Sequence, residues 1–116
     1  MIKNIYRGEV YYADLSPTQG SEQGGRRPVL IVQNNTGNRH APTTIILPLT
    51  TATTKKPLPT HIPIPPTTEN GLADNSTALA EQVKVIDKSR LKKRLGAVNE
   101  EIMTEVDKAI RVSLGV

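Results

Sequence analysis

Apolar residues along the chain fall into short runs, separated by loops rich in proline, glycine, asparagine and threonine. Short apolar or alternating runs that contain β-branched residues are typical of strands. Residues 28–33 are apolar almost throughout, which predicts a strand buried on both faces. The pattern predicts strands at 9–15, 28–33, 43–50 and 61–64, one long or two joined strands over 76–86, and a short last strand over 92–98.

Pro48 and Pro63 lie inside two of these predicted strands. Because proline has no N–H to donate to a neighbouring strand, it is confined to sheet edges and bulges. The sequence therefore predicts an edge or a bulge in the 43–50 strand and an edge position for the 61–64 strand. Residues 34–42 predict a loop with room for one helical turn.

The C-terminal segment has a helical period. Asn99 is a good N-cap, and Glu100 and Glu101 place negative charge in the first turn, where the helix dipole favours it. Apolar residues then recur on one face: Ile102, Val106, Ala109, Ile110 and Leu114. We expect residues 1–116 to form one domain, a mainly β fold with a strongly bent sheet or barrel, short helical turns and a C-terminal α-helix.

Composition narrows the function classes. Fifteen Lys and Arg against eleven Asp and Glu give a formal charge of +4, which permits a polyanionic partner without requiring one. Cysteine is absent, so thiolate chemistry and disulfides are excluded. The three tyrosines are the only aromatic residues, too few to stack many successive bases. No segment of membrane-spanning length is apolar, and we expect a cytoplasmic protein.

The most informative segment is the glycine-rich loop from Gly20 to Pro28, which contains Arg26 and Arg27 directly before the apolar run. Guanidinium groups bind phosphate in a planar, bidentate manner. Because neighbouring strand residues point to opposite faces, we expect one of the two arginines in a groove and the other in solvent. The spacing of Gly20 and Gly25 is that of a P-loop, but the required Lys-Ser/Thr is absent, so a nucleoside triphosphatase is rejected.

The sequence gives only weak support for a metal site, a catalytic nucleophile or a second phosphate-binding site. His40 and His61 are far apart in the sequence, no ligand spacing indicates a metal, and surface or packing roles are favoured for both histidines. No signature of a Ser-His-Asp nucleophile is present. The basic run favours a solvated face, with a contact to a phosphate backbone as the alternative; its members are Lys88, Arg90, Lys92, Lys93 and Arg94.

The loop motif Gly-Ser-Glu-Gln-Gly-Gly-x-Arg-Pro and the residues around it resemble the MazF/PemK toxins of bacterial toxin–antitoxin pairs. The resemblance is strongest to the branch found in Gram-positive bacteria. The resemblance covers essentially the whole chain in order. It is carried by residues 7–17, 20–34, 37–39, 42–43, 58–61, 79–82 and 86–91.

This resemblance implies an SH3-like barrel that forms a homodimer, and a sequence-specific endoribonuclease that cleaves single-stranded mRNA without a metal, a cofactor or the ribosome. It also implies an antitoxin partner with a flexible acidic tail. The catalytic arginine and threonine of the family fall on Arg27 and Thr50. The expected RNA-binding residues are Gly20, Ser21, Glu22, Gln23, Gly24, Thr51, Glu81 and Gln82.

The chemistry implied is attack by the RNA 2′-OH, which yields 2′,3′-cyclic phosphate and 5′-OH ends. Arg27 would stabilise the charge on the phosphorus centre, and Thr50 would position the phosphate or the hydroxyl. The branch suggests a U-A-C-containing pentamer as the target. The alternative is a non-enzymatic protein on the same fold, either a gyrase-directed toxin or an RNA-binding module without activity.

Overall fold

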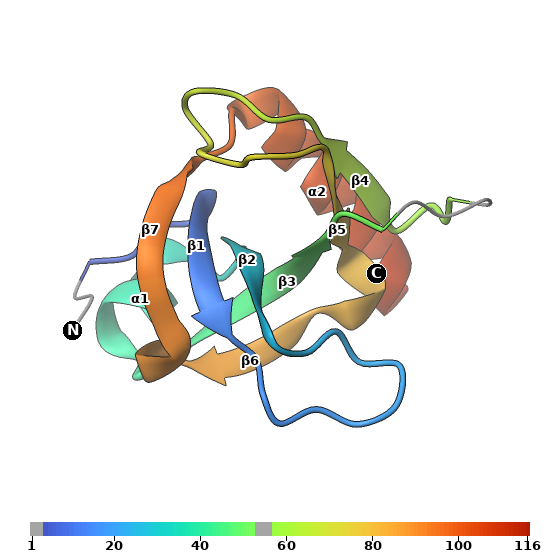
Figure 1. Ribbon diagram of the computed structural model, residues 1–116. Coiled ribbons are helices and arrows are strands. Elements are labelled where there is room, and N and C mark those ends of the chain that lie inside the picture. The colour runs from blue at the N-terminus through green and yellow to red at the C-terminus, as the bar shows by residue number, and fades with distance from the viewer. Residues whose placement is uncertain (1–3, 53–56) are drawn as a thin grey trace.

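The computed structural model describes residues 4–52 and 57–116, and its elements follow the predicted order (Figure 1). The strands are β1 (Glu9–Asp14), β2 (Arg26–Ile31), β3 (Thr43–Thr50), β4 (His61–Ile64), β5 (Ser76–Leu79), β6 (Lys84–Asp87) and β7 (Leu91–Ala97). The helices are α1 (Asn35–His40), α2 (Glu100–Leu114) and two 3₁₀ turns, η1 (Ala80–Gln82) and η2 (Lys88–Arg90).

All strand pairs of the described chain are antiparallel, in the order β4-β5-β3-β2-β1-β7, with β6 also paired to β3. The sheet is strongly curved, and α2 packs across one side of it (Figure 1). Its two faces carry separate apolar clusters. One includes Val10, Leu30 and Leu47 beneath Val106 and Ala109 of α2, and the other includes Tyr11, Val29 and Ile31. The predicted fold class is confirmed.

Burial explains why the apolar run becomes β2. Val29, Leu30 and Ile31 are completely buried, as predicted for a strand covered on both faces. The strand is shifted by two residues from the predicted range, however. Arg26 and Arg27 pair with Asp14 and Ala13 of β1, which extends the ladder toward the loop.

The expected edge at Pro48 is wrong. β3 is an interior strand that pairs with β2 on one side and with β6 and then β5 on the other. Pro48 is tolerated because it lies between the β6 pairing, which ends at Ile46, and the β5 pairing, which begins at Leu49. Pro63 does lie on an edge, since β4 pairs with β5 alone in the described chain.

The 76–86 segment consists of two strands, which resolves the choice left open by the sequence. β5 pairs with the end of β3 and β6 with its beginning, and η1 turns the chain between them. The predicted helix is also confirmed. The Asn99 side chain accepts a hydrogen bond from the Ile102 N–H at 2.9 Å, and α2 ends at Gly115 with φ of 73°.

The connection between β4 and β5 packs its backbone directly against β7. A Cβ atom on Gly71, whose φ is +67°, would lie 2.0 Å from the Leu95 carbonyl oxygen. A Cβ atom on Gly96 would lie 2.1 Å from the Glu69 carbonyl oxygen. Glycine is therefore required on both sides of this contact, which also contains the hydrogen bond from Ala97 N–H to Glu69 O at 2.9 Å.

We predict that Gly71→Ala destabilises the protein more than Gly115→Ala does. Both glycines have positive φ, but a Cβ atom on Gly115 would meet nothing within 4 Å. Gly115→Ala is the control, and it should lower the unfolding free energy by about 1 kcal/mol, which is the cost of the backbone conformation alone. The steric clash should add roughly 2 kcal/mol at Gly71. Urea denaturation of both variants measures the difference, and equal losses would contradict the close packing.

Candidate functional site

Arg27 is held by the ends of two neighbouring strands. Its Nε donates to the Gly24 carbonyl at 2.8 Å, and its Nη1 donates to the Leu49 carbonyl at 3.1 Å. A guanidinium has five N–H donors, so these two bonds fix its orientation and leave the others for a ligand. Among the ion pairs found between described residues, none involves Arg27, so no carboxylate neutralises its charge.

Thr50 is the last residue of β3 and lies close to Arg27. The β2–β3 register pairs Val29 with Pro48, and its continuation by two residues brings Arg27 opposite Thr50. Directly opposed antiparallel residues have Cβ atoms about 4.5–5.5 Å apart. The Thr50 Oγ1 accepts a hydrogen bond from the Ala52 N–H at 3.1 Å, which leaves the hydroxyl proton available for donation. The structure thus brings together the two residues that the sequence predicts as catalytic.

Arg26 has the separate environment that strand alternation predicts. Its side chain is 64% exposed and its Nε lies 3.8 Å from an oxygen of Asp14. Arg27 is half-buried and makes hydrogen bonds to two carbonyls. The two arginines are therefore not equivalent.

Gln82 fastens the glycine-rich loop to the turn after β5. Its Oε1 accepts from the Gln23 N–H at 2.7 Å, and its Nε2 donates to the Ser21 carbonyl at 3.3 Å. An ion pair of 3.9 Å between Lys84 and Glu22 spans the same two segments. Together they border a hollow of about 390 Å³, which is lined by Ser21, Glu22, Glu81, Gln82, Val83 and Lys84.

The remaining predicted residues have different places. Gly20 has φ of +57°, and a Cβ atom on Gly24 would lie 2.2 Å from the Thr18 hydroxyl oxygen, so both glycines shape the loop. Thr51 does not line the hollow next to Gln82. It borders a second hollow of about 270 Å³, together with residues of the β4–β5 edge that include Pro63 and Thr77. Thr77 pairs with Thr50 across the strands.

Thr60 and His61 were not among the predicted site residues, yet both contact Glu81. The Thr60 hydroxyl donates to Glu81 Oε1 at 2.8 Å, and the His61 Nε2 lies 2.9 Å from Glu81 Oε2. The His61 Nδ1 accepts from the Leu58 N–H at 3.2 Å, which orients the ring. His61 is a packing residue, as favoured from sequence, and only the 58–61 family match hinted at a role in the site.

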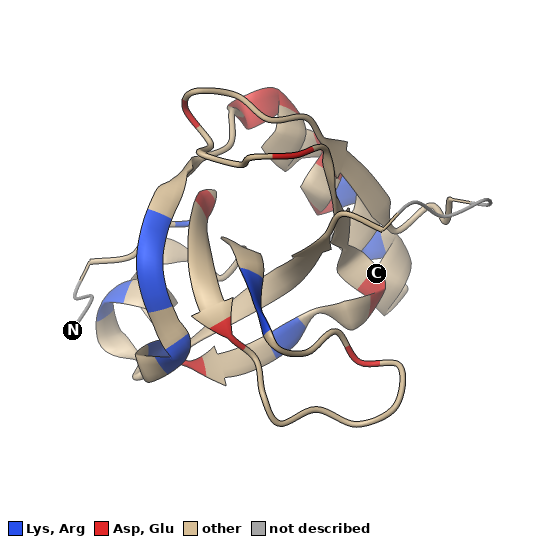
Figure 2. Ribbon diagram, in the orientation of Figure 1, with Lys and Arg blue, Asp and Glu red and all other residues tan. Residues whose placement is uncertain are grey.

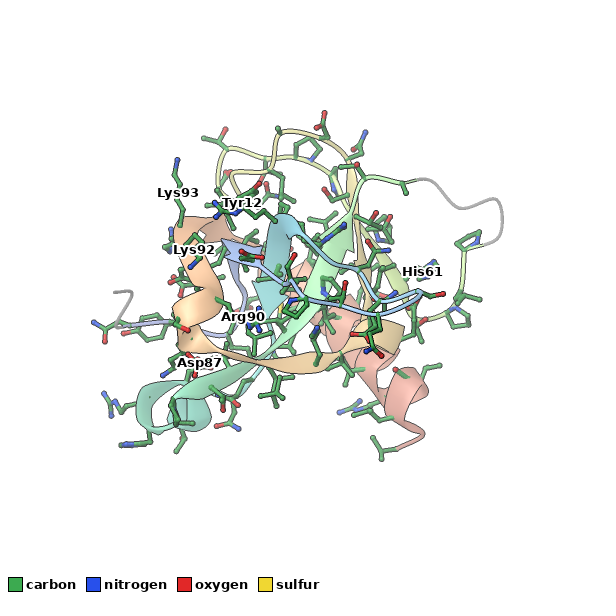
Figure 3. All side chains as sticks on the ribbon, turned by 60° about the horizontal axis from the view of Figure 1, so that its bottom comes forward. Tyr12, His61, Asp87, Arg90, Lys92 and Lys93 are labelled. Atoms are coloured by element: carbon green, nitrogen blue, oxygen red, sulfur yellow. The ribbon has the colours of Figure 1, made fainter. Side chains whose placement is uncertain are left out.

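Hydrogen bonding determines the charge state of Glu81. Burial by itself raises the pKa of this carboxyl, but hydrogen bonds from the backbone, His61 and Thr60 outweigh that effect and lower the pKa below its usual range. Glu81 is thus a carboxylate acceptor that faces the hollow. His61, which contacts Glu81, lies on the opposite side of the molecule from Tyr12, Lys92 and Lys93 (Figure 3).

Metal binding and membrane insertion can be judged over the described residues, 4–52 and 57–116. No group of three His, Cys, Asp or Glu side chains is arranged to hold a metal ion there. No helix in that part of the chain has both the length and the apolar character needed to cross a membrane.

The curved seven-stranded sheet and its C-terminal helix form a fold shared with known bacterial toxins. A family model described as the PemK-like, MazF-like toxin of type II toxin–antitoxin systems matches residues 6–114. The chain therefore belongs to this toxin family.

Individual relatives agree with this assignment. The endoribonuclease MazF of Staphylococcus epidermidis is 50% identical over 111 residues, which are 96% of this chain and 92% of that protein. A mycobacterial endoribonuclease solved with its cognate antitoxin is 30% identical, with a TM-score of 0.79, and the match covers 97% of this chain and 96% of that one. MazF of Deinococcus radiodurans shares the fold, with a TM-score of 0.83 at 24% identity over 97% and 98% of the chains.

These comparisons confirm the predicted family, including its Gram-positive branch, and the predicted class of endoribonuclease toxin. They do not address the roles of individual residues, which stay predictions.

We predict that Gln82→Leu releases the glycine-rich loop. Loss of the hydrogen bond to the Gln23 amide should raise the hydrogen-exchange rate of that amide about fivefold, since one such bond contributes on the order of 1 kcal/mol. Gln19→Leu is the matched control because Gln19 is exposed in the same loop. Unchanged exchange at Gln23 in the Gln82 variant would show that the tether does not hold the loop.

The Glu81 contacts should also give a pH-dependent stability. A carboxyl whose folded pKa is lowered contributes stability above its ordinary value of 4.5, and that contribution disappears as the pH falls through the folded pKa. The difference in unfolding free energy between the natural protein and Glu81→Gln should therefore shrink as the pH falls from 7 toward 3. A difference that stays constant would contradict the lowered pKa.

Proposed function

We propose that this protein cleaves single-stranded RNA, principally mRNA, at a specific sequence, and that Arg27 and Thr50 carry out the chemistry. The observation that carries the proposal is the fixed, unneutralised guanidinium of Arg27 placed opposite the hydroxyl of Thr50. Family membership and the named endoribonuclease relatives support it. Each subunit is one domain spanning residues 1–116.

The substrate supplies its own nucleophile. The 2′-oxygen attacks the adjacent phosphorus while the bond to the 5′-oxygen breaks, which leaves a 2′,3′-cyclic phosphate. The 2′-OH loses its proton, and the departing 5′-oxygen gains one. The free N–H groups of Arg27 stabilise the additional negative charge on the phosphate oxygens, and the pre-oriented fork does so without reorganisation.

Arg27 is permanently charged and cannot act as a base, so its part is electrostatic. The Thr50 hydroxyl donates to a phosphate oxygen or to the 2′-oxygen and fixes the in-line geometry. The chemistry requires no metal, cofactor or ribosome. DNA can bind but does not react, because it lacks the 2′-OH.

The hollow beside Gln82 serves for base recognition. Its lining offers carboxylate and amide groups, and Ser21, Glu81 and Gln82 are suited to reading base edges by hydrogen bonds. Glu22 and Gln23 complete this wall, and Thr51 extends the RNA path to the second hollow. A U-A-C-containing pentamer is the proposed target.

Exposed apolar side chains indicate how two subunits assemble. Apolar side chains remain exposed on β6 and at the end of α2, where Val85 is 60% exposed, Val112 57% and Leu114 57%. We assign this surface to a homodimer.

The antitoxin presents a flexible acidic segment to the basic toxin, and the mycobacterial relative was solved with its cognate antitoxin. An mRNA substrate places the protein in the cytoplasm.

Incubation with a long single-stranded RNA in EDTA should give discrete fragments with 5′-OH ends, which polynucleotide kinase labels without prior phosphatase treatment. Arg27→Ala should lower the cleavage rate by about 10³-fold, and Thr50→Val by roughly 10²-fold. Arg27→Lys keeps the charge but loses the fork, and should recover little of the activity.

Arg26→Ala is the matched control, since it removes the same charge from the exposed position. On a short RNA that contains only the cleaved sequence, it should retain activity within a fewfold. Circular dichroism should show that all variants are folded. Full activity of Arg27→Ala, or cleavage that requires a divalent metal, would refute the mechanism. Intact RNA together with blocked gyrase supercoiling would instead identify a gyrase-directed toxin.

A further inference from the structure

A tyrosine and several cations gather on β1, β2, η2 and β7, away from the proposed groove. We call this surface the basic face and define it by Tyr12, Arg26, Arg90, Lys92 and Lys93. Figure 3 shows Tyr12, Arg90, Lys92 and Lys93 on one side of the molecule and His61 on the other. Figure 2 shows basic residues along β7 and η2. In the described chain, β7 pairs only with β1, so its outer edge is free of strand pairing.

Strand register brings the basic face together. Tyr12 of β1 pairs with Lys93 of β7 on one side and with Pro28 of β2 on the other. The Tyr12 hydroxyl lies 3.5 Å from the Arg26 carbonyl, at the limit of a hydrogen bond, and its side chain is half-exposed. A single aromatic ring is thus placed between cations of two neighbouring strands.

The cations of this face outnumber its carboxylates. Arg90 donates to the carbonyls of Asp14, at 3.2 Å, and Ser16. Lys92 donates to the Ser89 carbonyl at 3.1 Å. Arg26 is near Asp14, and Asp87 accepts from the Ser89 N–H. Four cations therefore face two carboxylates, and no ion pair between described residues involves Lys92 or Lys93.

Two other members of the basic run contact residues outside the basic face and do not belong to it. Arg94 forms an ion pair of 2.5 Å with Glu9, and the Lys88 ammonium donates to the Asn38 carbonyl. Among the described residues, a carboxylate therefore neutralises Arg94, whereas Lys92 and Lys93 keep their charge for solvent or a ligand.

We propose that the basic face binds the phosphate backbone of the RNA strand that flanks the cleaved segment. This inference rests on the proposed function, because it extends the path of the same substrate. Asp14 and Arg26 pair at the base of the loop whose Ser21 and Glu22 line the hollow beside Gln82. An RNA held in that hollow can therefore continue past the base of the loop toward Lys92 and Lys93.

The chemistry favours RNA over an acidic peptide. Regularly spaced phosphates suit a row of cations, and a half-exposed tyrosine ring can stack on one base regardless of its identity. Arg90 and Arg26 add forks suited to phosphate oxygens. None of these five residues lines a described hollow that could hold an apolar side chain of a peptide.

The test compares two RNAs that contain the same cleaved sequence, one with and one without long single-stranded flanks. The double variant Lys92→Gln/Lys93→Gln should lower kcat/KM about tenfold for the flanked RNA at low salt and leave the short RNA unchanged. Lys93→Gln and Lys108→Gln form a matched pair, since each removes one exposed charge. Only Lys93→Gln should have an effect.

A binding assay keeps this inference separate from the cleavage proposal. Fully 2′-O-methylated flanked RNA cannot react, and its affinity for the natural protein can be measured by fluorescence anisotropy over a range of salt concentrations. Loss of two phosphate contacts should reduce the slope of log K against log salt by about 1.4 in the double variant. Tyr12→Leu should weaken binding about fivefold and leave that slope unchanged.

Several outcomes would overturn the inference. These are equal losses on short and flanked RNA, no change in the salt slope, or an equal effect of Lys108→Gln. If the double variant loses affinity only for a poly-glutamate peptide, the face binds an acidic protein segment and the RNA assignment is wrong. Failure of the natural protein to cleave any RNA would refute the proposed function, whereas the anisotropy result would still decide the basic face.

Discussion

The position of β3 is the constraint on which the rest of the structure depends. It pairs with β2 along one side, and on the other side it changes partner from β6 to β5 around Pro48. Proline removes a ladder donor at that point, which suits a place where no partner strand is available to accept. The change lets the sheet curve and brings the end of β3 beside the start of β2. Arg27 and Thr50 meet there, and the turn that carries Glu81 and Gln82 follows directly after β5.

The site combines a rigid part with an adjustable one. Arg27 is tied to the carbonyls of Gly24 and Leu49, and the strands that hold it are anchored by fully buried residues such as Val29 and Leu30. The loop above it is attached mainly through Gln82, by two side-chain hydrogen bonds. Each bond contributes on the order of 1 kcal/mol, so a ligand that binds the same groups can replace them at small cost. The residues proposed for catalysis are therefore fixed, while the loop proposed to recognise bases can adapt.

Electrostatics gives the two arginines and the basic run their separate roles. Arg26 and Arg27 are neighbours in sequence, but strand alternation places them on opposite faces, one in solvent near Asp14 and one hydrogen-bonded to the Leu49 carbonyl. The same principle divides the cations near β7. Arg94 is neutralised by Glu9, whereas the described residues form no ion pair with Lys92 or Lys93. Position on the sheet, rather than charge alone, decides which cation is available to a phosphate.

The sequence by itself determined the order of elements, the buried β2 strand, the Asn99-capped helix and the toxin family, because these depend on local periodicity, capping and a specific loop motif. Strand alternation predicted that Arg26 and Arg27 differ in environment, and the family motif selected Arg27 as the catalytic candidate. Only the tertiary structure showed that β3 is interior despite Pro48, and that Thr60 and His61 hold Glu81. It also showed that Lys92 and Lys93 lie near Tyr12 while Arg94 is paired. These results depend on strand pairing and on contacts between residues distant in the chain, and local sequence patterns do not encode them.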